Sequence, residues 1–413
     1  MSDEAIVPFR IDVREEVLSD LRSRLERTRW TDETDAEPWR YGPPVGWMRQ
    51  VVAHWLNHYD WRREEARLNA FRQFTTEIDG TSVHFVHHVG VGRDPMPLVL
   101  THGWPGSFVE MLRIIPLLTD PAAHGGRAED AFTVVAPSIP GYGFSGRPSG
   151  PMDYAMVADM WATLMSRLGY RRFGAQGGDW GSWISAALAM RHPDRLAGLH
   201  LNYLSTRFRP GVGPDDPPVS PEEQSHLDRT ARWVEEEGAY IAIQATKPLT
   251  LGYALGDSPV GLAAWLLEKF RTWSDCGVVP EEAIPLDELL TDVMVYWVTN
   301  TAHSAARFYA GSRERPFHLA PGERILPPCG VVNLPRELPM PPRSWAERAF
   351  NIVHWTHLPR GGHFAAMEQP ELLAADIRDF FRPLRGLRAR RPLADSPARS
   401  ASHVDHGDGL ILG

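Results

Sequence analysis

The sequence has few of the features that mark secreted, metal-binding or nucleic-acid-binding proteins. It contains only two cysteines, Cys276 and Cys329, and neither lies in a Cys-x-x-Cys pair or near a Cys/His cluster. We therefore expect neither a disulfide framework nor a structural zinc site. The formal net charge of -9 argues against a nucleic-acid partner, because binding to phosphates requires a basic face.

Long hydrophobic runs are also lacking, and we expect no leader sequence. No apolar run approaches the ~20 residues of a membrane span, and the N-terminus lacks the basic stretch and apolar segment of a signal peptide. We expect a cytoplasmic protein without a membrane anchor. With 413 residues, of which 43% are hydrophobic, the chain is long enough for a sizeable core and more than one structural unit.

Residues 1–72 are predicted to form a helical N-terminal region. Asp12 and Glu15 have the spacing of a capping box, and apolar residues then recur at helical intervals as far as Arg29. After a break rich in Pro and Gly, Trp47 and Trp55 belong to the apolar stripe of a second helix.

Residues 73–204 alternate between short apolar strands and helix-like stretches. Asp79-Gly80 separates two alternating runs and predicts a β-hairpin. Later strands are expected at residues 97–101, 132–136, 172–176 and 198–204. Strands that alternate with helices indicate βαβ units, and hence a largely parallel sheet with helices on both faces.

Residues 205–320 interrupt this alternation with a predicted helical lid. A loop rich in Pro and Asp at 214–221 leads into helices expected at 227–245, 260–273 and 286–310. The alternation resumes in residues 321–385, with strands at 329–334 and 349–357 and a closing helix at 370–384. The tail at 386–413 is expected to be disordered, because it is rich in Arg, Ala, Ser and Gly.

The motif Gly177-Gly178-Asp179-Trp180-Gly181-Ser182 lies between a predicted strand and a predicted helix. This is the context of the nucleophile elbow of α/β-hydrolases, in which small residues on both sides allow a strained turn to expose the central side chain. A G-x-D-x-G sequence by itself is more often an ordinary turn with a solvated Asp. The fold class that the motif predicts is α/β, with the α/β-hydrolase fold.

The identity of Asp179 restricts the chemistry. A serine that attacked a saturated carbon would leave an ether, which water cannot cleave, whereas a carboxylate leaves an ester that activated water can hydrolyse. An aspartate at the elbow therefore favours an sp³ electrophile such as an epoxide or an alkyl halide over an ester or amide.

A second motif, His102-Gly103-Trp104-Pro105-Gly106-Ser107, follows the predicted strand at 97–101. In the α/β-hydrolase fold, the loop that follows this strand contributes to the oxyanion hole. The backbone N–H groups of Trp104 and Trp180 are the candidate donors to a tetrahedral anion formed at the Asp179 ester. The side chain of His102 is expected to be structural.

His363 and Glu337 are the candidates for base and acid. The order Asp179, Glu337, His363 along the chain matches the nucleophile, acid and base of the α/β-hydrolases. Glu347 and Glu368 are nearby competitors for the acid, and His363 alone could be an ordinary loop histidine. The three motifs in this order, each at the end of a strand, favour the catalytic interpretation.

One motif is misleading. Residues 141–146 fit G-x-G-x-x-G, but Pro148 and Pro151 follow where the helix of a dinucleotide-binding site would have to begin. We expect no nicotinamide cofactor, and the proposed chemistry requires no other cofactor and no metal.

The motifs HGWPGS, GGDWGS and RGGHFAAME together resemble signatures of the microsomal-type epoxide hydrolases, and the resemblance covers roughly residues 5–385. It implies that two lid tyrosines, at Tyr240 and Tyr309, hydrogen-bond the epoxide oxygen. It also implies an acid eight residues before a tryptophan, which Glu337 and Trp345 reproduce. From the sequence alone Tyr203, Tyr253 and Tyr296 are equal rivals for the tyrosine role.

These inferences combine into one expected function. Asp179 attacks a small apolar or aromatic epoxide while Tyr240 and Tyr309 assist opening, and His363 with Glu337 then activates water to release a vicinal diol. A haloalkane dehalogenase with the same nucleophile is the nearest alternative, and a catalytically silent binding protein is a further one. The sequence leaves the oligomeric state open, and a homodimer is allowed.

Overall fold

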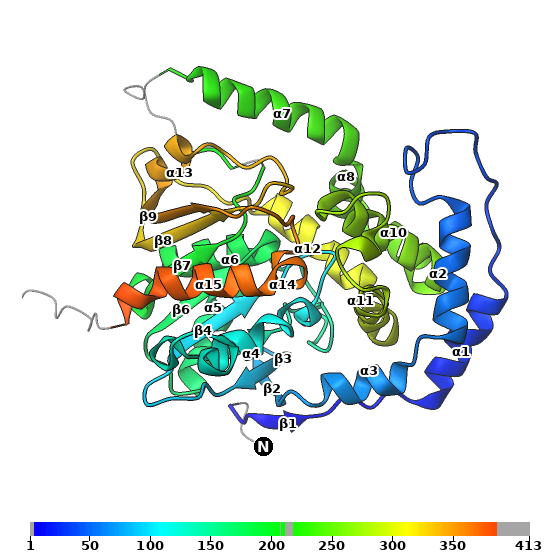
Figure 1. The fold of residues 1–413 in the computed structure, drawn as a ribbon, viewed down its shortest axis with the longest axis horizontal. Coiled ribbons are helices and arrows are strands. Elements are labelled where there is room, and N and C mark those ends of the chain that lie inside the picture. The colour runs from blue at the N-terminus through cyan, green and yellow to red at the C-terminus, as the bar shows by residue number, and fades with distance from the viewer. Residues whose placement is uncertain (1–3, 207, 211–217, 386–413) are drawn as a thin grey trace, which may run out of the picture.

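A computed structural model describes residues 4–206, 208–210 and 218–385 (Figure 1). Within these residues, nine strands form one sheet in the order β1-β2-β3-β5-β4-β6-β7-β8-β9. The tail at 386–413, which we expected to be disordered, and residues 214–217 of the loop expected at 214–221 lie outside the described residues.

The sheet is mostly parallel, as predicted, with an antiparallel edge. Strands β4 to β9 pair in parallel, whereas β1, β2 and β3 are antiparallel to their neighbours. The strands are β1 (Val7–Phe9), β2 (Gln73–Ile78), β3 (Thr81–His88), β4 (Met96–Thr101), β5 (Phe132–Pro137), β6 (Phe173–Gly177), β7 (Leu196–Leu201), β8 (Ile325–Asn333) and β9 (Phe350–His357). The predicted hairpin is confirmed: Asp79 and Gly80 have φ values of 50° and 70° between β2 and β3.

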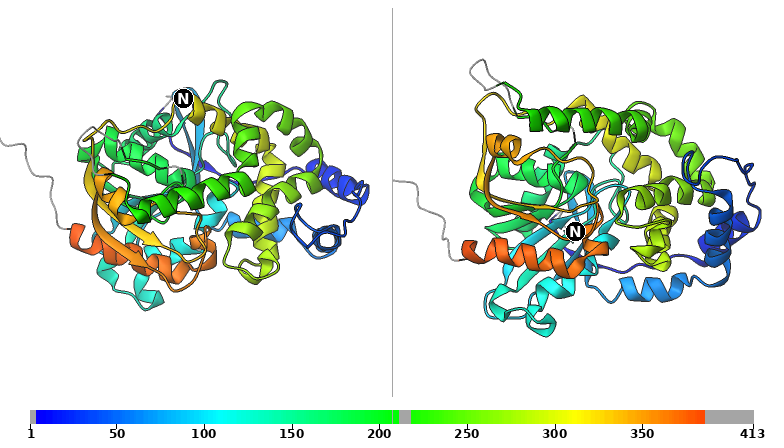
Figure 2. Two further views of the ribbon diagram at one scale, coloured as in Figure 1. Left: turned by 90° about the horizontal axis from the view of Figure 1, so that it is seen from above. Right: turned by 45° about the horizontal axis from the view of Figure 1, so that its top comes forward.

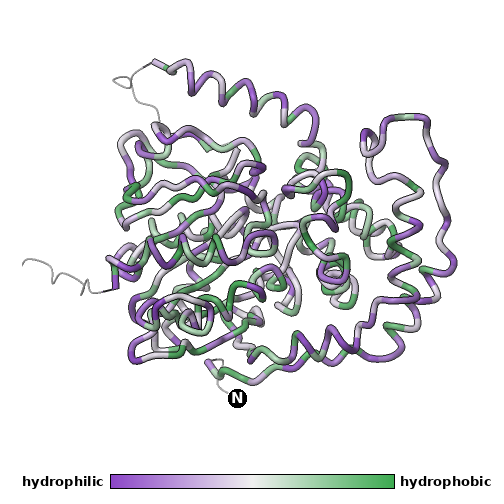
Figure 3. Tube along the Cα trace, in the orientation of Figure 1, coloured by the Kyte–Doolittle hydropathy of each residue, from purple (hydrophilic) through white to green (hydrophobic). Residues whose placement is uncertain are grey.

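Helices cover both faces of the sheet. Helices α5 (Tyr154–Arg167) and α6 (Asp179–Arg191) pack together on one face, and α4 (Ile114–Thr119) and α15 (Pro370–Phe381) on the other (Figure 1). The rings of Phe380 and Phe381 in α15 lie against Gly330 and Gly174 of the strands. They are so close that a Cβ on either glycine would overlap a ring. Strands β5, β6 and β7 are buried at every residue, which is typical of a parallel sheet covered on both faces. Figure 3 shows hydrophobic stretches of the trace in this part of the molecule.

A helical insertion connects β7 to β8 and lies beside the carboxyl ends of the parallel strands (Figure 1). Its helices are α7 (Pro221–Glu237), α8 (Ala239–Thr246), α9 (Pro248–Asp257), α10 (Pro259–Trp273), α11 (Leu286–Thr299) and α12 (Ala302–Glu314). Among the described residues, no helix combines the length and hydrophobicity needed to cross a membrane.

The helical stretches predicted at 227–245 and 286–310 are helical in the structure, and each is divided into two helices. The first break is at Gly238, where a Cβ would overlap the carbonyl of Val234. The second is at Asn300, which adopts a left-handed conformation with φ 51° and ends α11.

The N-terminal helices are α1 (Glu15–Glu26), α2 (Val45–Asn57) and α3 (Trp61–Leu68). The predicted capping box is wrong, because the residue that precedes α1 is Arg14 and no side chain caps the helix. Distant hydrogen bonds hold the preceding segment instead, from Ile11 N–H to Asn69 and from Val13 N–H to Glu65. The helix also ends at Glu26, short of the expected Arg29.

The N-terminal helices α1 and α2 pack against α10 of the insertion (Figure 2). Arg24 pairs with Asp257 at 2.9 Å, and the indole of Trp47 donates to Glu281 at 3.0 Å. His54 also lies 2.7 Å from Asp287. Only β1 joins the sheet, so α1 and α2 hold the insertion from the side opposite the strands.

Candidate active site

Asp179 stands at a sharp turn between β6 and α6. Its φ is 47°, a left-handed conformation that is rare for an aspartate and characteristic of a nucleophile elbow. A Cβ at Gly177 would overlap the backbone of Gly181, and one at Gly181 would overlap the carbonyl of Thr101. The two glycines therefore permit the tight contact that lifts Asp179 above the strand ends.

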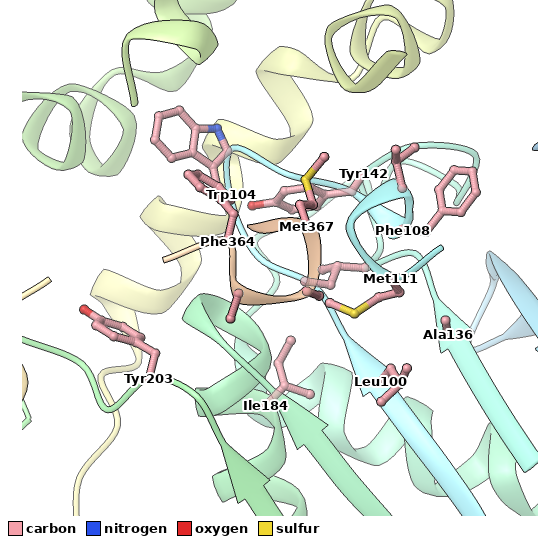
Figure 4. Close-up of a cluster of buried hydrophobic side chains, with 14 of the residues drawn as sticks. Leu100, Trp104, Phe108, Met111, Ala136, Tyr142, Ile184, Tyr203, Phe364 and Met367 are labelled. Atoms are coloured by element: carbon pink, nitrogen blue, oxygen red, sulfur yellow. The ribbon is translucent and has the colours of Figure 1, made fainter. Parts of the chain in front are cut away.

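One carboxylate oxygen of Asp179 is held by the loop after β4. The backbone N–H of Trp104 donates to Asp179 Oδ1 at 2.9 Å. The N–H of Trp180 lies in the first turn of α6, where amides have no acceptor within the helix and the helix dipole favours negative charge. Figure 4 shows Trp104 extending from this loop toward the helices of the insertion.

His363 and Glu337 meet beside Asp179. Nδ1 of His363 lies 2.6 Å from Glu337 Oε1, and Nε2 lies 3.5 Å from Asp179 Oδ2. Burial opposes a charge on His363, but the carboxylates of Glu337 and Asp179 outweigh it and hold the pKa of the imidazole well above its usual value. Asp179, Glu337 and His363, the three residues predicted as nucleophile, acid and base, therefore lie in one contact network.

The competing acids have other environments. Glu347 is exposed and pairs with Arg343 at 2.6 Å. Glu368 accepts hydrogen bonds from the N–H groups of Gly362 and Phe364, both at 3.0 Å, so it supports the loop that carries His363. Burial raises the pKa of Glu368 to about 7.

Tyr240 on α8 and Tyr309 on α12 approach Asp179 from the insertion. The Tyr240 ring stacks on Trp104 at 4.9 Å, and the two tyrosine rings lie 5.9 Å apart. Burial, followed by the negative charges nearby, including that of Asp179, holds the pKa of Tyr309 well above its usual value. Its phenol therefore remains protonated and can act as a hydrogen-bond donor.

The three other tyrosines that the sequence left as candidates have environments different from those of Tyr240 and Tyr309. Tyr253 is 82% exposed, and the Tyr296 hydroxyl donates to the carbonyl of Gly106 at 2.7 Å. Tyr203 lines the same pocket as Tyr240, but its hydroxyl bonds to Thr206 at 3.0 Å.

A pocket of about 590 Å³ opens onto Asp179 between the core and the insertion. Its walls are largely aromatic, and the aromatic side chains include Tyr154, Trp180, Trp183, Tyr203, Trp233, Tyr240, Tyr309 and Phe317. Such a surface suits an apolar or aromatic molecule with a polar group at the end near Asp179.

Sequence reasoning missed Glu110, a buried carboxyl group that borders Asp179 and His363. The only sequence signal was its spacing from Ser107, and this spacing is that of an ordinary capping box. Ser107 does cap the short 3-10 helix Phe108–Met111. The pattern therefore gave no indication that Glu110 faces the site.

The chain matches two protein families that together span residues 6–237. Residues 6–111 match the family described as Epoxide hydrolase N terminus, and residues 96–237 match the alpha/beta hydrolase fold. Both assignments agree with the architecture and with the resemblance carried by the three sequence motifs.

Similar proteins cover nearly the whole chain. Epoxide hydrolase 1 of Sus scrofa is 38% identical, over 92% of this chain and 89% of its own length. The solved structure of Aspergillus niger epoxide hydrolase is 32% identical with a TM-score of 0.80, over 92% of this chain and 97% of that one. A Stigmatella aurantiaca relative is 46% identical over 92% of this chain and 86% of its own length. The chain therefore belongs to the epoxide hydrolase family of α/β-hydrolase-fold enzymes.

Proposed function

We propose that this epoxide hydrolase opens its substrate through a covalent ester on Asp179 and releases a vicinal diol. The observation that carries the proposal is the position of Asp179, with one oxygen held by the Trp104 N–H at 2.9 Å and the other 3.5 Å from His363 Nε2. The carboxylate also lines the aromatic pocket, from which an electrophile would approach.

In the first step a carboxylate oxygen of Asp179 attacks one epoxide carbon, and the bond from that carbon to the epoxide oxygen breaks. The electron pair of this bond moves to the oxygen, which is a poor leaving group unless a proton donor stabilises it. Tyr240 and Tyr309 are the proposed donors, because both rings adjoin Trp104 above Asp179.

In the second step His363 removes a proton from water, which attacks the carbonyl carbon of the ester. Esterification removes the negative charge of Asp179, so one of the interactions that raise the pKa of His363 is lost. The imidazole is then better able to act as a base, while Glu337 fixes its orientation. The N–H groups of Trp104 and Trp180 stabilise the tetrahedral anion.

We propose small apolar or aromatic epoxides as substrates. The aromatic walls of the pocket, together with the small number of polar groups near Asp179, support this class. No observation specifically favours the haloalkane alternative, and family membership supports the epoxide.

A single-turnover reaction in H₂¹⁸O tests the ester route. Excess enzyme is mixed with styrene oxide, and both the diol and the peptide that contains Asp179 are analysed by mass spectrometry. The first diol should contain no ¹⁸O, because its new oxygen comes from Asp179, and the label should remain in the peptide. A labelled first diol would contradict the proposal, since it would indicate direct attack by water.

Replacing Tyr240 or Tyr309 with phenylalanine is expected to slow ester formation by about 10² in each case, since each change removes one donor to the developing alkoxide. The quenching of tryptophan fluorescence in a stopped-flow experiment would report this step, because Trp180 lies 4.7 Å from the Tyr309 ring. Tyr253→Phe is the control, at an exposed position. Equal rates for all three variants would exclude the two tyrosines as donors.

Gly103→Ala is expected to reduce kcat/KM by at least about 10-fold, because a Cβ at this position would overlap the side chain of Asp179. Gly150→Ala is the matched control, since nothing lies within 4 Å of a Cβ there. Steady-state diol formation measures the activity, and circular dichroism shows whether each variant is folded. Wild-type activity in a folded Gly103→Ala variant would contradict the observed packing.

A further inference from the structure

Asp179 borders two cavities of very different size. The aromatic pocket of about 590 Å³ lies on one side, and a small cavity of about 10 Å³ lies on the other. The small cavity provides about the room that one water molecule requires. Tyr240 and Tyr309 line only the large pocket, whereas His363 and Glu110 line only the small one.

Polar as well as apolar side chains line the small cavity, and the polar ones matter here. They include Asp179, His363, Glu110, Gln176 and Asn202. A buried water needs two to four polar partners, and this set can supply them. The separation suggests that the epoxide and the water reach the Asp179 ester from different sides.

Glu110 is the one acidic residue of this wall that the two proposed steps do not use. It lies on the 3-10 helix Phe108–Met111 and is only 9% exposed. A Cβ at Gly106 would overlap the carboxyl group of Glu110, so the absence of a side chain at Gly106 makes room for it. The backbone of Gly103 favours the charged form of Glu110 and partly opposes the rise of its pKa that burial causes.

The surroundings of Glu110 hold it in place. Ser107 Oγ donates to Asp292 Oδ1 on α11 at 2.6 Å, and Tyr296 on the same helix bonds to the Gly106 carbonyl at 2.7 Å. Burial, together with the nearby charge of Asp292, holds the pKa of Glu110 well above its usual value. Even when protonated, a carboxyl group keeps an oxygen that can accept a hydrogen bond.

We propose that Glu110 positions the hydrolytic water in this small cavity. The inference rests on the proposed ester mechanism and extends it to a residue outside the Asp179, Glu337 and His363 network. One hydrogen of the water points to His363 Nε2 and the other to a carboxyl oxygen of Glu110, which leaves a lone pair of the water oxygen aimed at the ester carbonyl carbon.

The step balances without any further reactant. The water oxygen bonds to the carbonyl carbon, and His363 takes one proton. The tetrahedral anion then collapses, the bond to the diol oxygen breaks, and the His363 imidazolium returns the proton to that oxygen. The second proton of the water stays on the new Asp179 carboxyl group and then passes to the phenolate of Tyr240 or Tyr309, which gave its proton to the epoxide oxygen in the first step. Asp179 is thereby regenerated as a carboxylate that carries the oxygen from water, and Glu110 accepts a hydrogen bond throughout without changing its own protonation.

Transient kinetics of Glu110→Leu and Glu110→Gln test the proposal. Glu110→Leu should form the ester at the wild-type rate but hydrolyse it about 10²-fold more slowly, because the water loses one of its two orienting partners. Glu110→Gln retains an acceptor oxygen and should restore hydrolysis to within about 10-fold of wild type. Fluorescence quenching follows ester formation, and intact-mass spectrometry of quenched samples follows hydrolysis.

The control is Asp130→Asn, which changes another buried carboxyl group, one that pairs with Arg382 at 2.7 Å just before the start of β5. It should leave both rate constants unchanged. If the Glu110 variants hydrolyse the ester at the wild-type rate, or if both steps slow equally, the role of Glu110 is overturned while the ester mechanism stands. If the wild-type enzyme forms no ester at all, the proposed function itself fails.

Discussion

Asp179→Asn is expected to reduce kcat/KM for diol formation by about 10⁴-fold or more, because an amide cannot form the ester and the remaining groups offer only binding and electrostatic stabilisation. The substitution is nearly isosteric, and its amide oxygen can still accept the hydrogen bond from Trp104 N–H. The loss should therefore appear in the chemistry without unfolding the elbow. Chromatography of the diol under kcat/KM conditions measures the effect.

The control for this variant is Asp194→Asn, which makes the same chemical change at an exposed site after α6. It should retain wild-type activity. Residual activity of Asp179→Asn within about 100-fold of wild type, with ¹⁸O entering the first diol, would show that water opens the ring directly. Gradual recovery of activity on storage would indicate deamidation back to aspartate, and peptide mass analysis detects that change.

His363→Gln is expected to block the cycle at a different point. The ester should still form, and its hydrolysis should slow by about 10³-fold or more, because no other group is placed to take the proton from water. The adduct should accumulate to one equivalent per enzyme molecule, and intact-mass spectrometry would show the mass of the epoxide added to the protein. Asp179→Asn should show no such adduct.

His357→Gln is the matched control, since His357 is an exposed histidine at the end of β9. It should turn over epoxide at the wild-type rate without accumulating an adduct. Rapid turnover by His363→Gln, or the absence of any adduct with this variant, would remove His363 from the role of base in ester hydrolysis.

Much of the site could be predicted because its chemistry depends on short local motifs. Gly177 and Gly181 flank Asp179 within a few residues, and the strand and helix on either side have clear hydrophobic patterns. The order of Asp179, Glu337 and His363 then placed three distant residues at one edge of a parallel sheet. The structure brings these three side chains together, while their catalytic roles remain proposals.

Features that depend on distant contacts were not predictable. The start of α1 is fixed by Glu65 and Asn69, about fifty residues away in the chain, and these contacts override the local capping pattern. Glu110 is similar, because its environment includes Asp292 from α11. Glu110 and Asp292 are too far apart in the sequence for one local motif to include both, so the local pattern indicated only a helix cap.

The attachment of the insertion affects the stability of the site as a whole. The N-terminal helices hold it through Arg24 and His54, and Glu223 on α7 fastens its other end to Arg348. Local opening of the N-terminal region would therefore release the wall that carries Tyr240 and Tyr309. Regions joined in this way open as one cooperative unit, so amide hydrogen exchange in α1, α2 and the insertion should report a common opening free energy. The free energy needed to open the substrate pocket therefore depends on the contacts at both ends of the insertion, and not on the stability of the sheet alone.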